Sequence, residues 1–316
     1  MMLIAAIVVA TTHGVLVAQS GSLAMYDLTA TRILWSSGGV QTPTRIATSN
    51  DQAAVIDPIV NVVHIVDLGS GRGTTVQTGE TPIDAAFMDN QAYVLERDAR
   101  ALERVGVDGA RASINLAADP AFLRVASRRI YVYSRASGVL QEITTTPFAI
   151  ARTLNVAPFA SDFEIDAGVA YFVYPRAAKI AAISIPTMKP IREISVGAVP
   201  VDLAITPRSL AIADPSAKRV WMIEGEQSFA QAFARGFLRG LIGLGLTSGN
   251  RDFPTGVDRV FVAGRELLAY DSSTGTLYRG TKPIAQGVGP QAFSIGAHAI
   301  YVWSDTVRRL QRIEPE

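Results

Sequence analysis

The sequence contains no cysteine among its 316 residues. This absence excludes disulfide bonds, thiolate metal sites and cysteine nucleophiles, and it fits a reducing or an oxidising compartment equally well. Charged residues are also few, at 18% of the chain, and 29 Lys and Arg balance 28 Asp and Glu. The resulting net charge of +1 creates no overall field that attracts nucleic acid, so we expect no nucleic-acid partner.

Histidine is scarce as well, and the three histidines are His13, His64 and His298. No two of them show the spacing of three to five residues that is typical of zinc-binding pairs. The glycine-rich stretch GSGRG (69–73) is followed by a β-branched run and not by a helix, so we interpret it as a hairpin turn instead of a phosphate-binding loop. The residues therefore indicate no catalytic set, no metal site and no cofactor.

Long apolar runs are absent after the first residues, and none reaches the roughly 18 residues of a membrane span. The opening stretch MMLIAAIVVATTHGVLVAQS is compatible with a secretory signal that ends at LVA|QS, or with two β-strands and a turn. A signal requires a basic first region, and MML carries no side-chain charge. Residues 7–36 also align with later stretches, so we expect them to form a structural unit, with a cleaved signal over residues 1–18 as the alternative.

What the chain has in abundance is short β-branched and aromatic runs, such as AAVID, AYVLER and IYVYSR. The centres of eight such runs are 39, 39, 38, 40, 40, 50 and 40 residues apart. These centres are Leu16, Val55, Val94, Val132, Phe172, Ile212, Val262 and Val302. A proline precedes each unit after the first, at Pro43, Pro82, Pro120, Pro158, Pro200, Pro254 and Pro290. An aspartate marks the end of the third expected strand at Asp27, Asp67, Asp108 and Asp271.

Four short strands in about 40 residues, separated by turn residues, are typical of one blade of a β-propeller. A single blade cannot bury both of its faces, so the units must stack on one another. We therefore predict an all-β fold, a single β-propeller domain of four-stranded blades, and the register favours eight blades. Seven is the alternative if the first unit is removed. The units are expected at residues 1–42, 43–81, 82–119, 120–157, 158–199, 200–253, 254–289 and 290–316.

Two stretches show the repeat most clearly, IVDLGSGRGTTVQTGETPIDAAFMDNQAYVLER (65–97) and, more weakly, ISVGAVPVDLAITPRSLAIADPSAKRVWMIE (194–224). This repeat resembles that of the YVTN family of bacterial β-propellers, which is related in pattern to NHL and quinoprotein-like propellers. The likeness covers essentially the whole chain, although the letters YVTN never occur and the Asp-Gly before the second strand is degenerate. The resemblance implies an extracytoplasmic binding scaffold, located in the periplasm or at the cell surface.

In propellers the first strand of each blade lines the central channel, so residues just after the proline column surround one mouth of it. Mixed charge and an aromatic ring around a concave opening suit a small ligand or a peptide end. Most of the candidates lie two positions past a proline, and two acidic residues lie close by. The candidate binding residues are Arg45, Asp84, Phe122, Asp162, Asp202 and Asp258. The alternative is a set of solvated loops of varied sequence.

One segment, GEQSFAQAFARGFLRGLIGLGLTSGNRDF (225–253), is longer than the fourth strand that it replaces. Phenylalanines recur in it every four residues, with arginines on another face, and this spacing predicts a short helix near 228–241. We expect the apolar stripe to pack on the propeller edge or, if it faces outward, to make a peripheral contact. The partner surface predicted here comprises Phe229, Phe233, Arg235, Phe237 and Arg239.

Two classes of function stay open at this point. The first is a non-catalytic scaffold, expected to be monomeric, that recognises an unknown protein or small ligand at the channel mouth or through residues 225–253. The second is a propeller enzyme of lyase, lactonase or dehydrogenase type with a polar site at the same mouth. Because the sequence shows no catalytic motif, it favours the scaffold over the enzyme.

Overall fold

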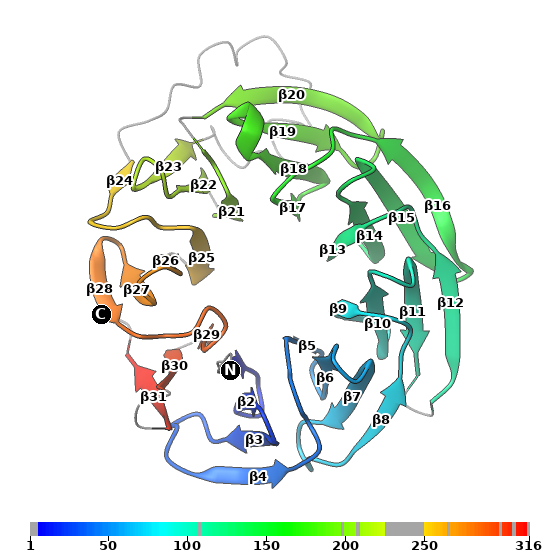
Figure 1. Ribbon diagram of the computed structural model, residues 1–316, viewed down its shortest axis with the longest axis vertical. Helices are drawn as coiled ribbons and strands as arrows, with labels where there is room; N and C mark the ends of the chain where they lie inside the picture. Colours follow the sequence, from blue (N-terminus) through cyan, green and yellow to red (C-terminus); the bar gives the residue numbers. More distant parts are fainter. Residues whose placement is uncertain are drawn as a thin grey trace. The chain divides into compact units, whose positions relative to one another are not determined.

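The computed structural model describes residues 6–106, 109–196, 199–206, 209–224, 250–263, 266–296, 299–304 and 308–314. These residues form eight antiparallel sheets, and the helical content among them is one 3₁₀ turn, η1 (Pro175–Ala177). The chain therefore adopts the all-β fold of an eight-bladed propeller, as the repeat predicts (Figure 1). It divides into two compact units, Met1–Pro158 with Val288–Glu316, and Phe159–Gly287.

The first unit holds five blades, each a meander whose strands pair in chain order. Blade 1 comprises β1 (Ile7–Ala10), β2 (Val15–Gln19), β3 (Ser22–Tyr26) and β4 (Ile33–Ser37). Blade 2 comprises β5 (Arg45–Thr48), β6 (Gln52–Asp57), β7 (Val62–Asp67) and β8 (Gly73–Gln77). Blade 3 comprises β9 (Pro82–Met88), β10 (Gln91–Glu96), β11 (Ala101–Val105) and β12 (Arg111–Asn115). Blade 4 comprises β13 (Pro120–Ala126), β14 (Arg129–Ser134), β15 (Val139–Thr145) and β16 (Phe148–Asn155). Blade 8 comprises β29 (Phe293–Ile295), β30 (Ile300–Ser304) and β31 (Arg309–Ile313).

The second unit holds blades 5 to 7, built in the same way. Blade 5 comprises β17 (Asp162–Asp166), β18 (Val169–Tyr174), β19 (Lys179–Ser184) and β20 (Lys189–Ser195). Blade 6 comprises β21 (Asp202–Ile205), β22 (Ser209–Asp214), β23 (Arg219–Glu224) and β24 (Arg251–Asp252). Blade 7 comprises β25 (Arg259–Ala263), β26 (Glu266–Asp271), β27 (Thr276–Arg279) and β28 (Lys282–Ala285).

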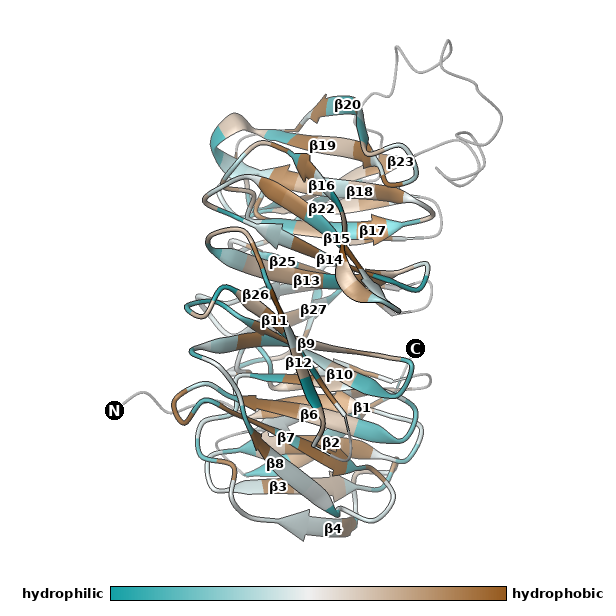
Figure 2. Ribbon diagram, turned by 90° about the vertical axis from the view of Figure 1, so that its right-hand side faces the viewer, coloured by the Kyte–Doolittle hydropathy of each residue, from teal (hydrophilic) through white to brown (hydrophobic). Residues whose placement is uncertain are grey.

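The second strand of each blade is the most buried, and this explains the recurring aromatic runs. Every residue of β18 and β22 is buried, and each of these strands pairs with a neighbouring strand on both edges. A strand buried on both faces reads as a continuous apolar run instead of an alternating one. The fourth strands β4 and β8 are largely exposed, and they appear in pale, mixed colours in Figure 2.

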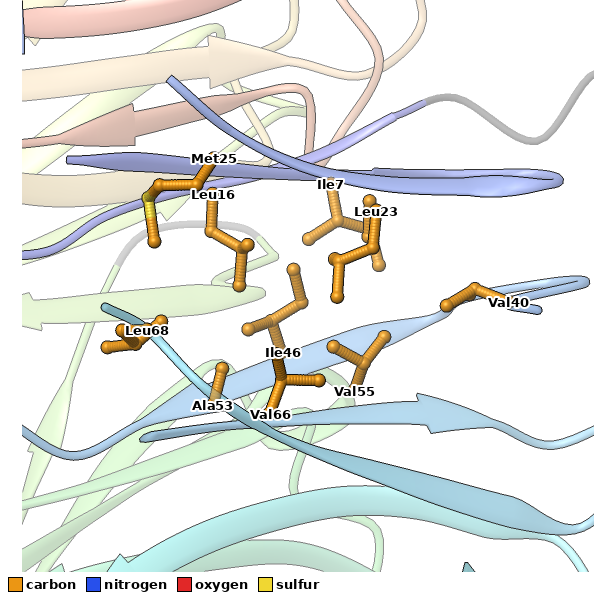
Figure 3. Packing of buried hydrophobic residues seen from close by; sticks show 11 residues of the cluster. Ile7, Leu16, Leu23, Met25, Val40, Ile46, Ala53, Val55, Val66 and Leu68 are labelled. Atoms are coloured by element: carbon orange, nitrogen blue, oxygen red, sulfur yellow. The ribbon is translucent and has the colours of Figure 1, made fainter. Parts of the chain in front are cut away.

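Buried side chains of one blade pack against those of the next. Between blades 1 and 2, Leu16, Leu23 and Met25 meet Ile46 and Val55 (Figure 3). Similar clusters join blades 2 and 3, 3 and 4, 5 and 6, and 6 and 7. Each cluster buries apolar surface that a lone blade would expose to water, at a cost of about 25 cal/mol per Å². Stacking of blades therefore supplies the core of each unit.

Buried acids at the end of the second strand attach the incoming loop to its blade. Asp57 Oδ2 accepts the backbone N–H of Gln41 at 2.6 Å, and Asp214 Oδ2 accepts that of Val199 at 3.2 Å. The acids at this position are Asp57, Glu96, Asp214 and Asp271, each at most 3% exposed. A buried carboxylate needs such donors because burial without them is costly. This column of acids is structural, and the repeat in the sequence did not predict it.

Residues 7–37 form blade 1, as the alignment of repeats predicts. The first strand of this blade, β1, joins blade 8, since the N–H of Val8 donates to the carbonyl of Gln291 at 2.9 Å. The GSGRG stretch lies in the hairpin between β7 and β8, where Ser70 donates its backbone N–H to Asp67 Oδ1 at 2.7 Å. The hairpin interpretation of this stretch is confirmed.

The seventh unit differs from the prediction. The repeat predicts VFVAGR (260–265), centred on Val262, as the second strand of this unit, and Asp271 as the end of the third strand. In the structure Val262 belongs to the first strand, β25, and Asp271 ends the second strand, β26. The repeat period misleads here because this first strand is as rich in β-branched and aromatic residues as the second strands of other blades.

The predicted helix near 228–241, with Phe229, Phe233, Arg235, Phe237 and Arg239, lies outside the residues that the structure describes. His298 and Asp108 lie outside them too. Within the described part, no helix has the length and apolar character needed to cross a bilayer.

Candidate functional site

The predicted binding residues share one position in the fold. Each of five residues lies in the first strand of its blade and faces the next-to-last residue of the second strand. The facing pairs are Arg45 with Ile56, Asp84 with Leu95, Phe122 with Tyr133, Asp162 with Val173, and Asp202 with Ala213. Blades 2 to 6 therefore present these five side chains from equivalent places, which we call the first-strand position.

Blade 7 holds a different residue there from the one predicted. Arg259 faces Tyr270 and occupies the first-strand position, whereas Asp258 lies one residue earlier. The carboxylate of Asp258 accepts the backbone N–H of Ser272 at 2.9 Å. Arg259 could not be found by counting two residues past Pro254, because that count stops short of it. Asp271, the acid that ends the second strand, was the signal that could have fixed the register of this blade, because Arg259 faces the residue just before it.

In the first unit, Arg45 and Asp84 form an ion pair between blades 2 and 3. Arg45 Nε donates to Asp84 Oδ1 at 2.9 Å, and the N–H of Ala85 donates to the same oxygen at 2.9 Å. The Asp84 side chain is 9% exposed, but that of Arg45 is 48% exposed. The carboxylate is thus held by its partners, while the guanidinium is open to solvent and can contact an anionic or polar group.

Phe122 provides the aromatic member of the set. Its ring stacks on that of Tyr133 with centroids 6.3 Å apart and planes 9° from parallel. The hydroxyl of Tyr133 donates to the carbonyl of Ala157 at 2.9 Å, which holds this ring in place. The stacked pair is accordingly a rigid surface, suited to contact with a flat or apolar group.

In the second unit, Asp162 and Asp202 form a carboxyl pair between blades 5 and 6. Asp162 is 7% exposed and hydrogen-bonds the side chain of Asp202, which also accepts the backbone N–H of Val260 at 2.8 Å. Burial, and then the charge of Asp162, raises the pKa of Asp202 well above its ordinary value, although the Val260 N–H and the Arg259 charge oppose this. Two carboxyls that interact in this way titrate as a coupled pair.

The charged residues at the first-strand position form two polar clusters, the Arg45–Asp84 ion pair in the first unit and the Asp162–Asp202 carboxyl pair in the second. The described residues contain no group of three or more His, Cys, Asp or Glu that could hold a metal ion. Of the histidines in this part of the chain, His13 lies 3.3 Å from Asp51 and His64 Nδ1 lies 2.9 Å from Thr75 Oγ1. Among the described residues of the first unit, neither histidine contacts the Arg45–Asp84 ion pair. The cluster in the first unit offers a solvent-exposed guanidinium beside a carboxylate, and the cluster in the second unit offers a pair of titratable carboxyls.

No family model matches the chain, and no curated protein sequence matches it. Solved structures do match, among them BamB from Moraxella catarrhalis, with a TM-score of 0.67 and 11% identity over 98% of this chain and 96% of that chain. Another is virginiamycin B lyase from Staphylococcus aureus, with a TM-score of 0.63 and 13% identity over 87% of this chain and 95% of that one. A third is the dihydro-heme d1 dehydrogenase NirN in complex with DHE, with a TM-score of 0.66 and 13% identity over 89% of this chain and 66% of that one.

These likenesses define the class of protein: the chain is a β-propeller. Two of the three matched structures are enzymes of unrelated chemistry, a lyase and a dehydrogenase. At identities of 11% to 13% the match carries the fold and no activity with it. Function must therefore be argued from the site residues of this chain.

Proposed function

We propose that the chain is a non-catalytic binding scaffold of the YVTN-like propeller type, which recognises a protein or small ligand through its first-strand positions. The supporting observation is charge at positions where the fold does not need it. Blade 1 fills the equivalent place with Ile7 and blade 4 with Phe122, so an apolar residue is structurally sufficient. Blades 2, 3, 5, 6 and 7 carry Arg45, Asp84, Asp162, Asp202 and Arg259 there.

The energetics support a role for these charges. A carboxylate taken out of water is costly unless it is paired, and apolar replacements of buried ion pairs are often neutral or stabilising. Asp84 and Asp162 are each 7% exposed, so stability alone does not account for them. A recognition site accounts for them, because polar groups on a rigid scaffold fix the orientation of a ligand.

A thermal-shift screen tests this proposal. Purified wild-type chain is melted with a panel of amines, carboxylic acids, sugars and short peptides, beside the double variant Asp162→Asn with Asp202→Asn. Asp166→Asn is the matched control, because Asp166 lies in the same strand, β17, but is exposed. A ligand at 100 times its Kd adds about 2.7 kcal/mol of stability, enough for a shift of several degrees.

We expect at least one compound class to raise the melting temperature of the wild type and of Asp166→Asn, but not of the double variant. A compound that also raises the melting temperature of the double variant would show that it binds at a place other than the carboxyl pair. If every class leaves the wild type unchanged, the proposed ligand site in the second unit is wrong.

An enzyme of lyase, lactonase or dehydrogenase type is the second candidate, and the raised pKa of Asp202 is the observation that favours it. A carboxyl group whose pKa is raised holds its proton to higher pH and can donate it to a substrate. The test is turnover of lactone, ester and alcohol substrates, the last with an electron acceptor. Turnover that is lost in Asp202→Asn but kept in Asp166→Asn would replace the scaffold with this enzyme.

A further inference from the structure

Blade 8 has an open edge where the other blades have a fourth strand. In the described part of the chain it consists of β29, β30 and β31, whereas each of the other seven blades has four strands. The strand β31 pairs with β30 along one side, from Arg309 opposite Ser304 to Ile313 opposite Ile300. Alternate residues of an antiparallel strand turn their N–H and C=O groups away from the partner. The outer edge of β31 therefore presents main-chain groups that no described strand pairs.

The exposure of β31 is unlike that of the third strands in other blades. In β11 and β19 most residues are buried, because a fourth strand covers them. In β31 the buried residue is Leu310, at 1% exposure, while Arg309, Gln311 and Arg312 are exposed. The sequence RLQRI is accordingly more polar than ALERV or KIAAIS. The edge of β31 is therefore polar, and no strand among the residues that the structure describes pairs with it.

A hollow lies along this edge, within the first unit. Its volume is about 560 Å³, inside the range of ligand sites, and it is lined by the five residues of β31 together with Thr29 and Ala30. Thr29 and Ala30 belong to the turn between β3 and β4 of blade 1, and Asp27 holds this turn by accepting the N–H of Thr31 at 2.9 Å. A fixed wall therefore faces the open strand across the hollow.

The charge of the edge is positive. Arg308 and Arg309 are exposed at the start of β31, and among the described residues neither makes an ion pair. Arg312 pairs with Glu314, so it is already neutralised. Two unpaired arginines at one end of an open strand attract an acidic segment, because a carboxylate accepts hydrogen bonds from a guanidinium in a defined geometry.

We propose that β31 binds an extended acidic segment of another protein, which adds to blade 8 as its fourth strand. The main-chain groups of β31 supply affinity, and alternate side chains of the segment read the arginines and the hollow. This site is separate from the first-strand positions, and it does not depend on the function proposed for them. The partner segment expected here carries a carboxylate at every second residue.

Arginine on an edge strand has a second explanation, which the test must separate. Natural proteins place charged side chains on edges to prevent pairing with other chains. An edge protected in this way binds no peptide, whatever its charge. An edge built for strand addition binds an acidic peptide and rejects a basic one.

The experiment measures fluorescence anisotropy of a labelled ten-residue peptide of alternating Glu and Val, titrated with the full chain. One control peptide carries Lys in place of each Glu, and another keeps Glu but is methylated on alternate backbone nitrogens. Arg309→Glu is compared with Arg128→Glu, which makes the same change of charge at an arginine that is 83% exposed on another blade. Hydrogen exchange of β31 amides is followed with and without peptide.

We expect the Glu-Val peptide to bind, and the Lys and methylated peptides to bind at least tenfold more weakly. Arg309→Glu should weaken binding at least tenfold and Arg128→Glu less than twofold, with peptide-induced protection confined to β31. Equal binding of all three peptides, or none, overturns the proposal, and so does binding that Arg309→Glu leaves unchanged. Slow exchange of the β31 edge before peptide is added would also overturn it, since the edge would then be covered by this chain or by a second copy.

Discussion

Glu96 and Glu103 show how one pair of side chains can make this fold sensitive to pH. Each is 3% exposed, Glu96 at the end of β10 and Glu103 in β11. Burial raises the pKa of Glu96 to about 7, and the neighbouring Glu103 contributes to the rise. The N–H of Gly79, which donates to Glu96 Oε1 at 2.7 Å, acts in the opposite direction and lowers the pKa. Arg111 Nε donates to Glu103 Oε1, but Glu103 Oε2 accepts no hydrogen bond from a described donor atom. A proton on Glu96 provides that donor.

The sign of the pH effect follows from the raised pKa. The folded protein holds this proton more tightly than the unfolded chain, so the stabilisation is present below about pH 4.5 and is lost as the pH rises through about 7. Glu96→Gln keeps the two hydrogen bonds and removes the titration. The wild type should therefore lose stability between pH 5 and pH 8 that the variant keeps. The difference in free energy of unfolding, variant minus wild type, should increase by on the order of 2 kcal/mol over this range, as measured by urea unfolding.

The matched control at the residue scale is Glu193→Gln, because Glu193 is 62% exposed and pairs with Lys179 at the surface. We expect its stability difference from wild type to be nearly constant over the same pH range. If Glu96→Gln behaves in the same way, the buried pair does not share a proton. Gly79→Ala provides a second check, because its Cβ would lie 2.4 Å from Glu96 Oε2 and would displace the carboxyl.

At the scale of elements, the strands of a blade are held mainly by the face they turn to the next blade. Leu16 of β2 is fully buried in the cluster between blades 1 and 2 (Figure 3), whereas Leu34 of the outer strand β4 is 43% exposed. Both are leucines of the same blade. Substituting each of them therefore shows how much stability depends on burial, because the residue type is the same at both positions.

Leu16→Ala should lower the free energy of unfolding by about 2–5 kcal/mol, because it removes buried methyl groups and leaves a cavity. Leu34→Ala should change it by no more than about 0.5 kcal/mol. Both values come from denaturant unfolding at neutral pH. Equal effects of the two substitutions would show that the cluster between blades 1 and 2 is not packed as described.

At the scale of the whole chain, charge is balanced, with 29 basic and 28 acidic residues. Phosphate backbones bind proteins through many lysines and arginines at once, and the affinity falls steeply with salt. We therefore expect no binding to double-stranded DNA or RNA in a gel-shift assay at physiological salt. A shifted band that disappears with increasing salt would contradict this and would point to a basic surface beyond those described.

The sequence alone determined the class of fold. Hydrophobic runs, turn residues and the proline that precedes each first strand are local features, and a repeat of about 40 residues copies them along the chain. Because each blade is a meander of neighbouring strands, local pattern and topology agree, and the eight blades could be counted in advance. The count survived an error in blade 7, where a β-rich first strand was taken for the second.

The tertiary structure decided which side chains meet. The sequence placed Arg45, Asp84, Asp162 and Asp202 near the start of a blade, but it could not show which of them pair. In blade 7 the sequence pointed to Asp258, whereas Arg259 occupies the first-strand position. The Arg45–Asp84 ion pair and the Asp162–Asp202 carboxyl pair join neighbouring blades through residues 39 and 40 positions apart. Small differences in loop length change which residue reaches such a position. The open edge of β31 is of the same kind: no other strand in the described part of the chain pairs with this edge, and the sequence alone does not show which strands are neighbours.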